Sequence, residues 1–294
     1  MSAIPAPPVA IRQPAKNRSL FARLWRNRMA RVGMFISAVV VLAALFGPAL
    51  APYDPVALNL ADRLTPPSAG HLMGADHLGR DIFTRVLYGA RISLQVGIVS
   101  VALGTVAGLL LGALAGYLGG RVDTVIMALM DAVYAFPAIL LALVLVAVFK
   151  PGLATVMTAI AIVRIPIFAR TVRASVLAER EKEYIEASRC VGQRGWLILA
   201  RHILPNIMAP LIVVTTTYFA TAIVVEASLS FLGLGVPPPA ASWGTMLNDG
   251  RKFMETAPHT VIFPGVAISL TVLGFNMLGD GLRDALDPRL KNLA

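Results

Sequence analysis

Six long apolar segments, separated by shorter polar stretches, dominate the sequence. They cover residues 32–51, 93–117, 124–149, 153–170, 211–233 and 260–280. Each approaches the roughly 20 apolar residues that an α-helix needs to cross a hydrocarbon core. Backbone polar groups find no water inside lipid, so a spanning segment of this kind forms a helix. The pattern therefore predicts an all-α polytopic membrane protein with six transmembrane helices.

Composition supports the membrane class, and the distribution of basic residues predicts the orientation. Hydrophobic residues make up 57% of the 294 residues and charged residues only 14%, whereas about a quarter of an average soluble domain is charged. If both termini lie in the cytoplasm, that side carries 19 of the 26 Lys and Arg residues and the other side carries 7. This is the positive-inside bias. We expect an N-in/C-in topology. The orientation then accounts for the net charge of +10, and nucleic-acid binding is not needed to explain it.

Four parts follow from this topology. They are a basic cytoplasmic tail over 1–31, a first transmembrane helix over 32–51, an extracytoplasmic segment over 52–92, and a five-helix core over 93–294 that includes a cytoplasmic loop at 171–209. The tail places Phe21, Leu24 and Trp25 on one helical face among arginines, which favours a helix lying on the anionic inner leaflet over a specific docking site. In the fourth span, Arg164 and Arg170 are expected near the membrane surface.

The cytoplasmic loop shows helical periodicity outside the predicted spans. A first apolar stripe comprises Leu177, Tyr184, Ala187, Ser188 and Val191, with Glu179, Glu183 and Glu186 on a different stripe. After Gly192 a second stripe comprises Trp196, Leu199, Ala200 and Ile203, and it stops at Pro205. We expect two short amphipathic helices joined at the glycine. One face of this hairpin serves its own chain and the other is available to a partner.

The same loop resembles the signature loop of permease subunits in binding-protein-dependent ABC importers. The resemblance rests on Glu186-Ala187-Ser188, on Gly192 after three further residues, and on Ile203-Leu204-Pro205. Ser188 and His202 depart from the family's more usual alanine and aliphatic residue. Further motifs are similar to the second, C-type permease of the dipeptide/oligopeptide (peptide/nickel) branch. These motifs span residues 51–55, 74–81, 88–91, 201–206, 230–235, 242–244 and 279–288.

The resemblance implies a division of labour in a bacterial inner membrane. Two permeases of the type I importer fold, different subunits that pair as a heterodimer, form the translocation path. Two separate ABC ATPases bind beneath them, and an extracytoplasmic solute-binding protein delivers the substrate. Glu186, Ala187, Ser188, Gly192, Ile203, Leu204 and Pro205 would form the coupling element that contacts an ATPase. The alternative is a hairpin that packs only on its own bundle.

The chain itself lacks the motif of an ATPase. A phosphate-binding P-loop needs Gly-Lys followed by Ser or Thr, and none of the five lysines follows a glycine. We therefore expect a non-catalytic subunit without a cofactor of its own, with ATP and Mg used by partner subunits. The same machinery importing nickel chelates, glutathione or other small peptides remains an alternative. A stand-alone secondary transporter or channel would instead predict internal repeats with matching broken helices.

Two acidic residues fall inside the predicted spans, where charges are costly and suggest function. Asp131 lies in the third span and Glu226 deep in the fifth. Both are candidates for the translocation path, and Glu226 is a candidate contact for a positive peptide amino terminus. The alternative for each is a buried hydrogen bond to a neighbouring helix or to the partner permease.

Metal binding has little support in the sequence. The lone Cys190 allows neither an intrachain disulfide nor a thiol cluster. His71, Asp76, His77 and Asp81 lie close together along the extracytoplasmic segment and are the remaining candidates for holding a cation. We favour the alternative, in which this amphipathic segment packs on the bundle through apolar residues. Those residues are Ile82, Phe83, Val86 and Leu87. No metal site is predicted.

Overall fold

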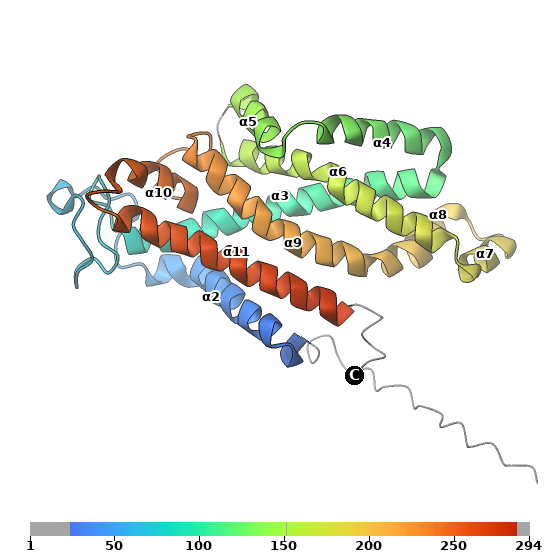
Figure 1. Ribbon diagram of the computed structural model, residues 1–294, viewed down its shortest axis with the longest axis horizontal. Helices are drawn as coiled ribbons and strands as arrows, with labels where there is room; N and C mark the ends of the chain where they lie inside the picture. The colour runs from blue at the N-terminus through green and yellow to red at the C-terminus, as the bar shows by residue number, and fades with distance from the viewer. Residues whose placement is uncertain (1–23, 151, 287–294) are drawn as a thin grey trace, which may run out of the picture.

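The computed structural model describes residues 24–150 and 152–286, and the regular structure in these ranges is helical (Figure 1). Five helices are long and apolar enough to cross a membrane. They are α2 (Arg28–Leu50), α3 (Ile82–Leu118), α6 (Leu153–Arg180), the continuous helix Gly195–Phe231, and α11 (His259–Leu286). The predicted all-α membrane architecture is confirmed. Residues 1–23 of the predicted tail, including Phe21, lie outside the described ranges.

The segment predicted as the third span contains a sharp bend. Helix α4 (Gly120–Tyr134) and helix α5 (Ala138–Phe149) meet at 88°. Pro137 lies directly before α5 with an extended ψ of 125°; it has no backbone N–H, and it disfavours helical geometry at the residue that precedes it. The third predicted span, 124–149, is therefore a bent pair of helices, and the chain has up to six spans if this pair counts as one. This is the only bent pair among the described residues. An inverted-repeat transporter would have a second broken helix at the corresponding position of its other repeat, and the described residues contain none.

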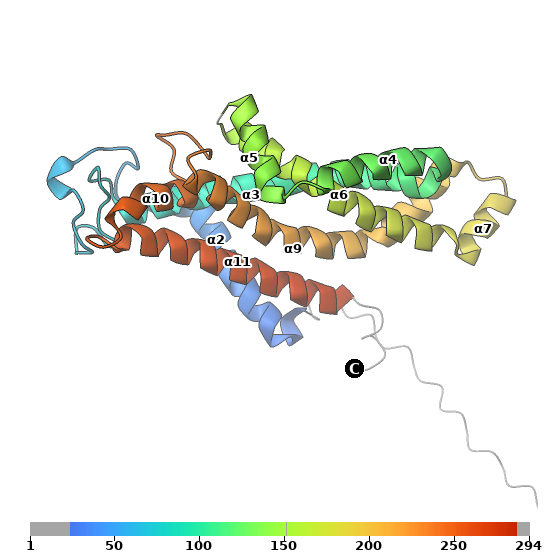
Figure 2. The ribbon, with the colours of Figure 1, turned by 45° about the horizontal axis from the view of Figure 1, so that its top comes forward.

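The two polar ends of the molecule lie at opposite ends of its long axis. Helix α7 (Glu183–Cys190) and helix α8 (Gly195–Ile198) lie at one end, while α10 (Trp243–Gly250) and the segment 51–81 lie at the other (Figures 1 and 2). Short 3-10 turns at Leu60–Asp62 and Arg251–Phe253 belong to the second end. Helices α3, α6 and α9 (Leu204–Phe231) run between the two ends.

Helices α3 and α6 form the centre of the bundle because glycines allow their backbones to approach closely. Gly104, Gly108, Gly112 and Gly116 recur at every fourth position of α3 and face α6. A Cβ added at Gly108 would lie 2.4 Å from the Cβ of Phe168, and one at Gly112 would lie 2.3 Å from the carbonyl oxygen of Ala169. Small residues at a fixed spacing are a common basis of helix association in membranes. The glycine spacing was visible in the sequence but was not used in the prediction.

Helix α2 packs along α11 on the side away from α4 and α5 (Figure 2). Gly33 of α2 lies against Gly274 and Leu278 of α11, and Gly281 of α11 lies against Ala30. Leu24, which precedes α2, is buried, whereas its neighbour Trp25 is 56% exposed. These two residues of the predicted tail therefore have different environments.

Candidate functional site

Helix α7 is fixed to the ends of two spanning helices. The Tyr184 hydroxyl donates a hydrogen bond to the Glu179 carboxylate of α6, and Asn206 Nδ2 of α9 donates to the Tyr184 oxygen at 2.9 Å. Lys182, directly before α7, pairs with Glu179 at 2.6 Å. Burial and the Glu179 hydrogen bond raise the pKa of Tyr184, and the Glu179 hydrogen bond raises the pKa of Lys182. Tyr184 thus stays neutral and Lys182 charged at neutral pH, which preserves the junction.

The outward face of α7 carries the predicted signature residues. Glu186 and Ala187 are exposed, and Ser188 is half-buried, donating to the Tyr184 carbonyl at 2.8 Å. The face that packs inward is centred on Ile185, which is fully buried, whereas Val191 is 87% exposed. The apolar stripe through Tyr184, Ala187 and Val191 is therefore largely exposed and is not the face that packs on the bundle. The helix is rotated so that small and apolar residues point away from the bundle.

Gly192 ends α7 in a conformation that suits glycine. Its φ is +79°, and a Cβ built there would meet no atom within 4 Å. The glycine is therefore required by backbone conformation and not by crowding inside this chain. Trp196, four residues later, is 64% exposed. An exposed turn with two apolar side chains, Val191 and Trp196, faces away from the molecule.

The second part of the hairpin is continuous with a spanning helix. Helix α8, a π-helical turn over Leu199–Ile203, and α9 form one run, and Pro205 lies in the first turn of α9. The prediction of a short helix that stops at Pro205 is therefore wrong. In the π turn the Leu204 N–H bonds to the Leu199 carbonyl, which widens the helix where the proline ring enters. Ile203 is fully buried, Leu204 is half-buried and Pro205 is exposed.

Two further contacts hold the hairpin in place. His202 Nε2 and Gln193 Oε1 lie 3.1 Å apart and link the turn to the π segment. A Cβ at Gly195 would lie 2.9 Å from the Tyr117 hydroxyl oxygen at the end of α3. The hairpin is therefore in contact with α3, α6 and α9, the three helices that run the length of the bundle.

The two acidic path candidates lie apart and have different environments. Asp131 is exposed on α4 and pairs with Arg170 of α6 at 2.5 Å. Glu226 of α9 is fully buried. It accepts hydrogen bonds from Ser230 Oγ at 2.8 Å and from Ser93 Oγ of α3 at 3.3 Å. The geometry gives both residues partners within this chain, and it does not bring them to one site.

A second polar cluster lies at the opposite end of the molecule. Arg80 forms ion pairs with Asp76 at 2.7 Å and with Asp249 of α10 at 3.2 Å. Arg85, which is 2% exposed, lies 3.8 Å from Asp249 and donates to the Pro55 carbonyl at 3.2 Å. Asp249 is far from the arginines in sequence, and no local signal predicted this cluster.

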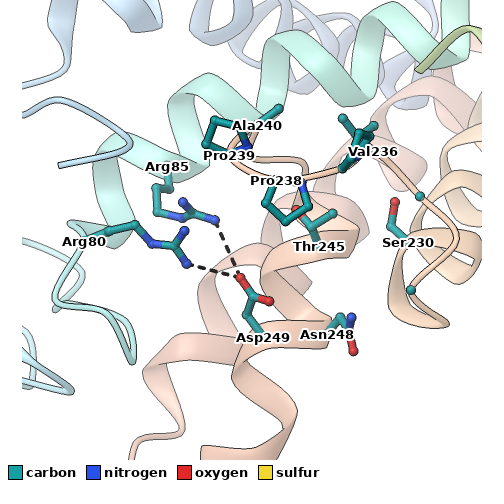
Figure 3. A pocket seen from close by; sticks show the side chains of 13 residues that line it. Arg80, Arg85, Ser230, Val236, Pro238, Pro239, Ala240, Thr245, Asn248 and Asp249 are labelled. Atoms are coloured by element: carbon teal, nitrogen blue, oxygen red, sulfur yellow. Dashed lines mark hydrogen bonds and ion pairs between the residues drawn. The ribbon is translucent and has the colours of Figure 1, made fainter. Parts of the chain in front are cut away.

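The cluster borders a cavity of about 160 Å³ beneath the loop that follows α9. Figure 3 shows both arginines pointing toward Asp249 on one side, with Pro238 and Pro239 forming part of the wall. Ser230, which also bonds Glu226, lies on the far side of this cavity. The cavity therefore connects the charged cluster at this end of the molecule to the buried polar network of α9.

The histidines proposed as alternative cation ligands have separate partners. His71 lies between Asp81 at 2.9 Å and Asp62 at 3.3 Å, and the hydrogen bond to Asp81 raises its pKa. His77 stacks on Phe253, with ring centroids 5.6 Å apart. In the described ranges no group of three or more His, Cys, Asp or Glu side chains is arranged to hold a metal ion.

The predicted apolar contacts of this segment are formed to different degrees. Ile82 is fully buried, while Phe83, Val86 and Leu87 are half-buried. Trp243 of α10 donates its indole N–H to the Val86 carbonyl at 2.9 Å. The segment that leads into α3 is thus joined to the loop between α9 and α11.

Two family models match the chain. Residues 108–292 match the family described as "Binding-protein-dependent transport system inner membrane component". Residues 18–67 match the "N-terminal TM domain of oligopeptide transport permease C". The two matches include both the hairpin and the first spanning helix.

Curated relatives match nearly the whole chain. A dipeptide transport system permease protein of Alkalihalophilus pseudofirmus is 49% identical over 94% of this chain and 90% of that protein. A glutathione transport system permease protein of Pectobacterium atrosepticum is 48% identical over 94% and 92% of the two chains. A di/tripeptide transport system permease protein of Pseudomonas aeruginosa is 44% identical over 99% and 98%.

Solved structures of transporters resemble the bundle in fold. An inward-facing form of the MetNI methionine ABC transporter gives a TM-score of 0.57 at 21% identity, covering 69% of this chain and 96% of that chain. An amino acid ABC transporter structure gives 0.54 at 15% identity, covering 68% and 92%. Both likenesses concern the arrangement of helices.

Proposed function

This chain belongs to the family of binding-protein-dependent transport system inner membrane components, and we propose that it forms half of the translocation path of an ATP-driven importer of di- and oligopeptides. The fold is that of a type I ABC importer permease, as the sequence predicted. The other half of the path would be a second, different permease subunit. Short peptides are the substrate class because a relative that is 49% identical is named as a dipeptide permease and another, 44% identical, as a di/tripeptide permease.

The observation that carries the proposal is the anchored hairpin at one end of the bundle. It contacts α3, α6 and α9, yet its outward face exposes Ala187, Val191 and Trp196. An exposed apolar surface on a rigidly held element favours a protein partner. We assign this face to a cleft of an ABC ATPase, with Glu186, Ser188 and Gly192 beside it. Ile203, Leu204 and Pro205 join the hairpin to the span and transmit its displacement.

The work in this importer is divided among several subunits. ATP and Mg bind to two partner ATPases, and this chain is a non-catalytic permease with no cofactor of its own. An extracytoplasmic solute-binding protein delivers the substrate to the end of the bundle that carries α10. The chain is a multi-pass component of a bacterial inner membrane, with both termini in the cytoplasm. The proposal includes the division of the chain into a cytoplasmic tail, a first transmembrane helix, an extracytoplasmic segment and a five-helix core. These parts cover 1–31, 32–51, 52–92 and 93–294.

A second substrate class rests on one observation. The Pectobacterium relative that is named for glutathione is nearly as similar as the dipeptide relative. Glutathione is itself a small peptide, so the same path would accept it. Nickel chelates were an alternative from the sequence, and no feature of the structure favours them.

Reconstitution tests the proposal. The two permeases and two ATPases are placed in proteoliposomes with the solute-binding protein outside, and uptake of a radiolabelled dipeptide and of glutathione is measured. We expect uptake only with internal ATP and only when this chain is present. Uptake driven by an ion gradient without ATP, or uptake in vesicles that lack this chain, would overturn the proposal.

A further inference from the structure

Arg164 differs from the other arginines of α6 in the charge of its surroundings. Arg170, Arg173 and Arg180 form ion pairs with Asp131, Asp123 and Glu181, respectively. Within the part of the chain that the structure describes, Arg164 has no acidic partner. Its Nε is buried and makes no hydrogen bond. The guanidinium therefore retains unused donors.

The guanidinium lies at the middle depth of the bundle. Its carbon Cζ is 5.0 Å from the centre of the Tyr218 ring, halfway along α9. A Cβ added at Gly104 would lie 3.5 Å from the Arg164 Cβ, and Gly104 is central to the apolar part of α3. Arg164 was expected toward the end of its span, near the membrane surface, but α6 continues past it to Arg180 and places it at mid-length of the bundle.

An aromatic ring lies beside Arg164, and threonines occur on the two helices that pack against α6. Thr215, one turn before Tyr218 on α9, lies with its Oγ1 3.4 Å from Thr105 Oγ1 on α3. The Tyr218 ring offers its face to the cation, an interaction that holds guanidinium groups without neutralising them. The Arg164 side chain is partly exposed, so its free donors can be reached from outside this chain's own packing.

An unpaired cation at this depth is costly in hydrocarbon. An anion that comes from outside this chain and pairs with Arg164 would account for the arginine at this position. Lipid phosphates lie at the surface and cannot reach the middle of the bundle. A guanidinium matches a carboxylate with two parallel, charge-assisted hydrogen bonds. Glu226 accepts hydrogen bonds from two serine hydroxyls and forms no ion pair with Arg164.

We propose that Arg164 binds the C-terminal carboxylate of the peptide as the peptide crosses the membrane. The proposal rests on the proposed function, since it needs this face of α6 and α9 to line the path. Every unmodified peptide carries this carboxylate whatever its side chains are. One fixed arginine would therefore suit a path that accepts many sequences, with the Tyr218 ring fixing the guanidinium plane.

Equilibrium binding tests the assignment. The complex of both permeases and both ATPases is purified in detergent without the solute-binding protein, and its affinities for radiolabelled Ala-Ala and Ala-Ala-amide are compared. The wild type should bind the free acid at least about tenfold more tightly than the amide, the scale of one charge-assisted pair. Arg164→Gln should abolish this preference and Arg164→Lys should keep part of it. Arg170→Gln, the matched control on α6, should keep all of it.

Three results would overturn the assignment. The first is a wild-type complex that binds the acid no more tightly than the amide, including one that binds neither. The second is an Arg164→Gln complex that keeps the preference. The third is an Arg164→Gln chain that no longer co-purifies with the second permease, because the arginine would then pair with a carboxylate of that subunit. Failure of the proposed function is seen separately, as absence of ATP-driven uptake by the wild-type importer.

Discussion

The Tyr184 hydroxyl bonds the Glu179 carboxylate and so joins helix α7 to the end of helix α6. Because Asn206 donates to the same oxygen, a single hydroxyl connects α6, α7 and α9. A helix held in this way moves with the spans to which it is attached. A displacement of α7 would therefore be transmitted through this junction to the spanning helices α6 and α9.

Removing this hydroxyl should weaken coupling without removing the helix. In Tyr184→Phe the ring remains, but the bonds to Glu179 and Asn206 are lost. A hydrogen bond to a charged group contributes on the order of 1.5–3 kcal/mol, reduced here because Tyr184 is 40% exposed. We expect the number of peptides imported per ATP hydrolysed to fall several-fold in proteoliposomes. Tyr53→Phe loses a hydroxyl bond to Gly70 at the other end of the molecule and should keep the wild-type ratio.

Gly192→Asp should leave the protein inserted and abolish transport. The site is open, since a Cβ meets nothing within 4 Å inside this chain, so a new charge is harmful only to a partner seated there. The positive φ adds a backbone cost of about 1–2 kcal/mol. Gly120→Asp is the matched control, with φ +54° and equally open space in another turn. Normal uptake by Gly192→Asp would contradict the assignment of this turn to an ATPase contact.

Crowding the interface of α3 and α6 should lower stability. Gly112→Ala places a methyl group 2.3 Å from the Ala169 carbonyl oxygen, and overpacking of this kind costs typically about 1–3 kcal/mol. We expect a clear fall in the melting temperature of the detergent-purified chain. Gly265→Ala in α11, where the nearest atom is 4.0 Å away, should be neutral or stabilising. Equal effects of the two substitutions would contradict the close packing described for α3.

The segment 51–81 should loosen as the pH rises through the pKa of His71. The hydrogen bond to Asp81 raises this pKa from its ordinary value near 6.5, and Asp62 adds to the shift. A raised folded-state pKa means that the stabilisation is complete below pH about 6.5 and is lost as the pH passes the folded value. Backbone hydrogen exchange of residues 59–81 should therefore accelerate when the pH rises above the folded-state pKa of His71. Asp81→Asn keeps a capping oxygen for α3 but should shift the midpoint to lower pH.

The sequence was informative where a pattern is local. The presence of the apolar spans, the basic asymmetry and the turn at Gly192 depend on neighbouring residues and are apparent from the sequence, whereas the ends of the spans are not. The rotation of α7 is not apparent either, because Ile185 is buried by the ends of other helices and not by its own periodicity. The run through Pro205 was also missed, since a π turn that accommodates a proline has no simple sequence signal.

Contacts between distant segments were the least predictable. Asp249 meets Arg80 across 169 positions, and nothing near either residue indicates the other. The prediction that Arg164 lies near the membrane surface depends on a span that ends at residue 170, ten residues before α6 ends. The error in helix length therefore concealed the one feature of α6 that suggests a ligand.

Glu226→Gln should separate a hydrogen-bonding role from a charge role. The carboxylate is fully buried and accepts from Ser230 at Oε1 and from Ser93 at Oε2. A glutamine keeps one of these acceptors, and its NH2 group can donate to the other serine hydroxyl, which can also accept. We expect dipeptide uptake and substrate range to stay within about twofold of wild type, less than the loss of one net hydrogen bond. Glu226→Leu leaves both serines without their acceptor inside the bundle and should lower the melting temperature. A large loss of uptake in Glu226→Gln, with normal assembly, would show instead that the negative charge itself is used in transport.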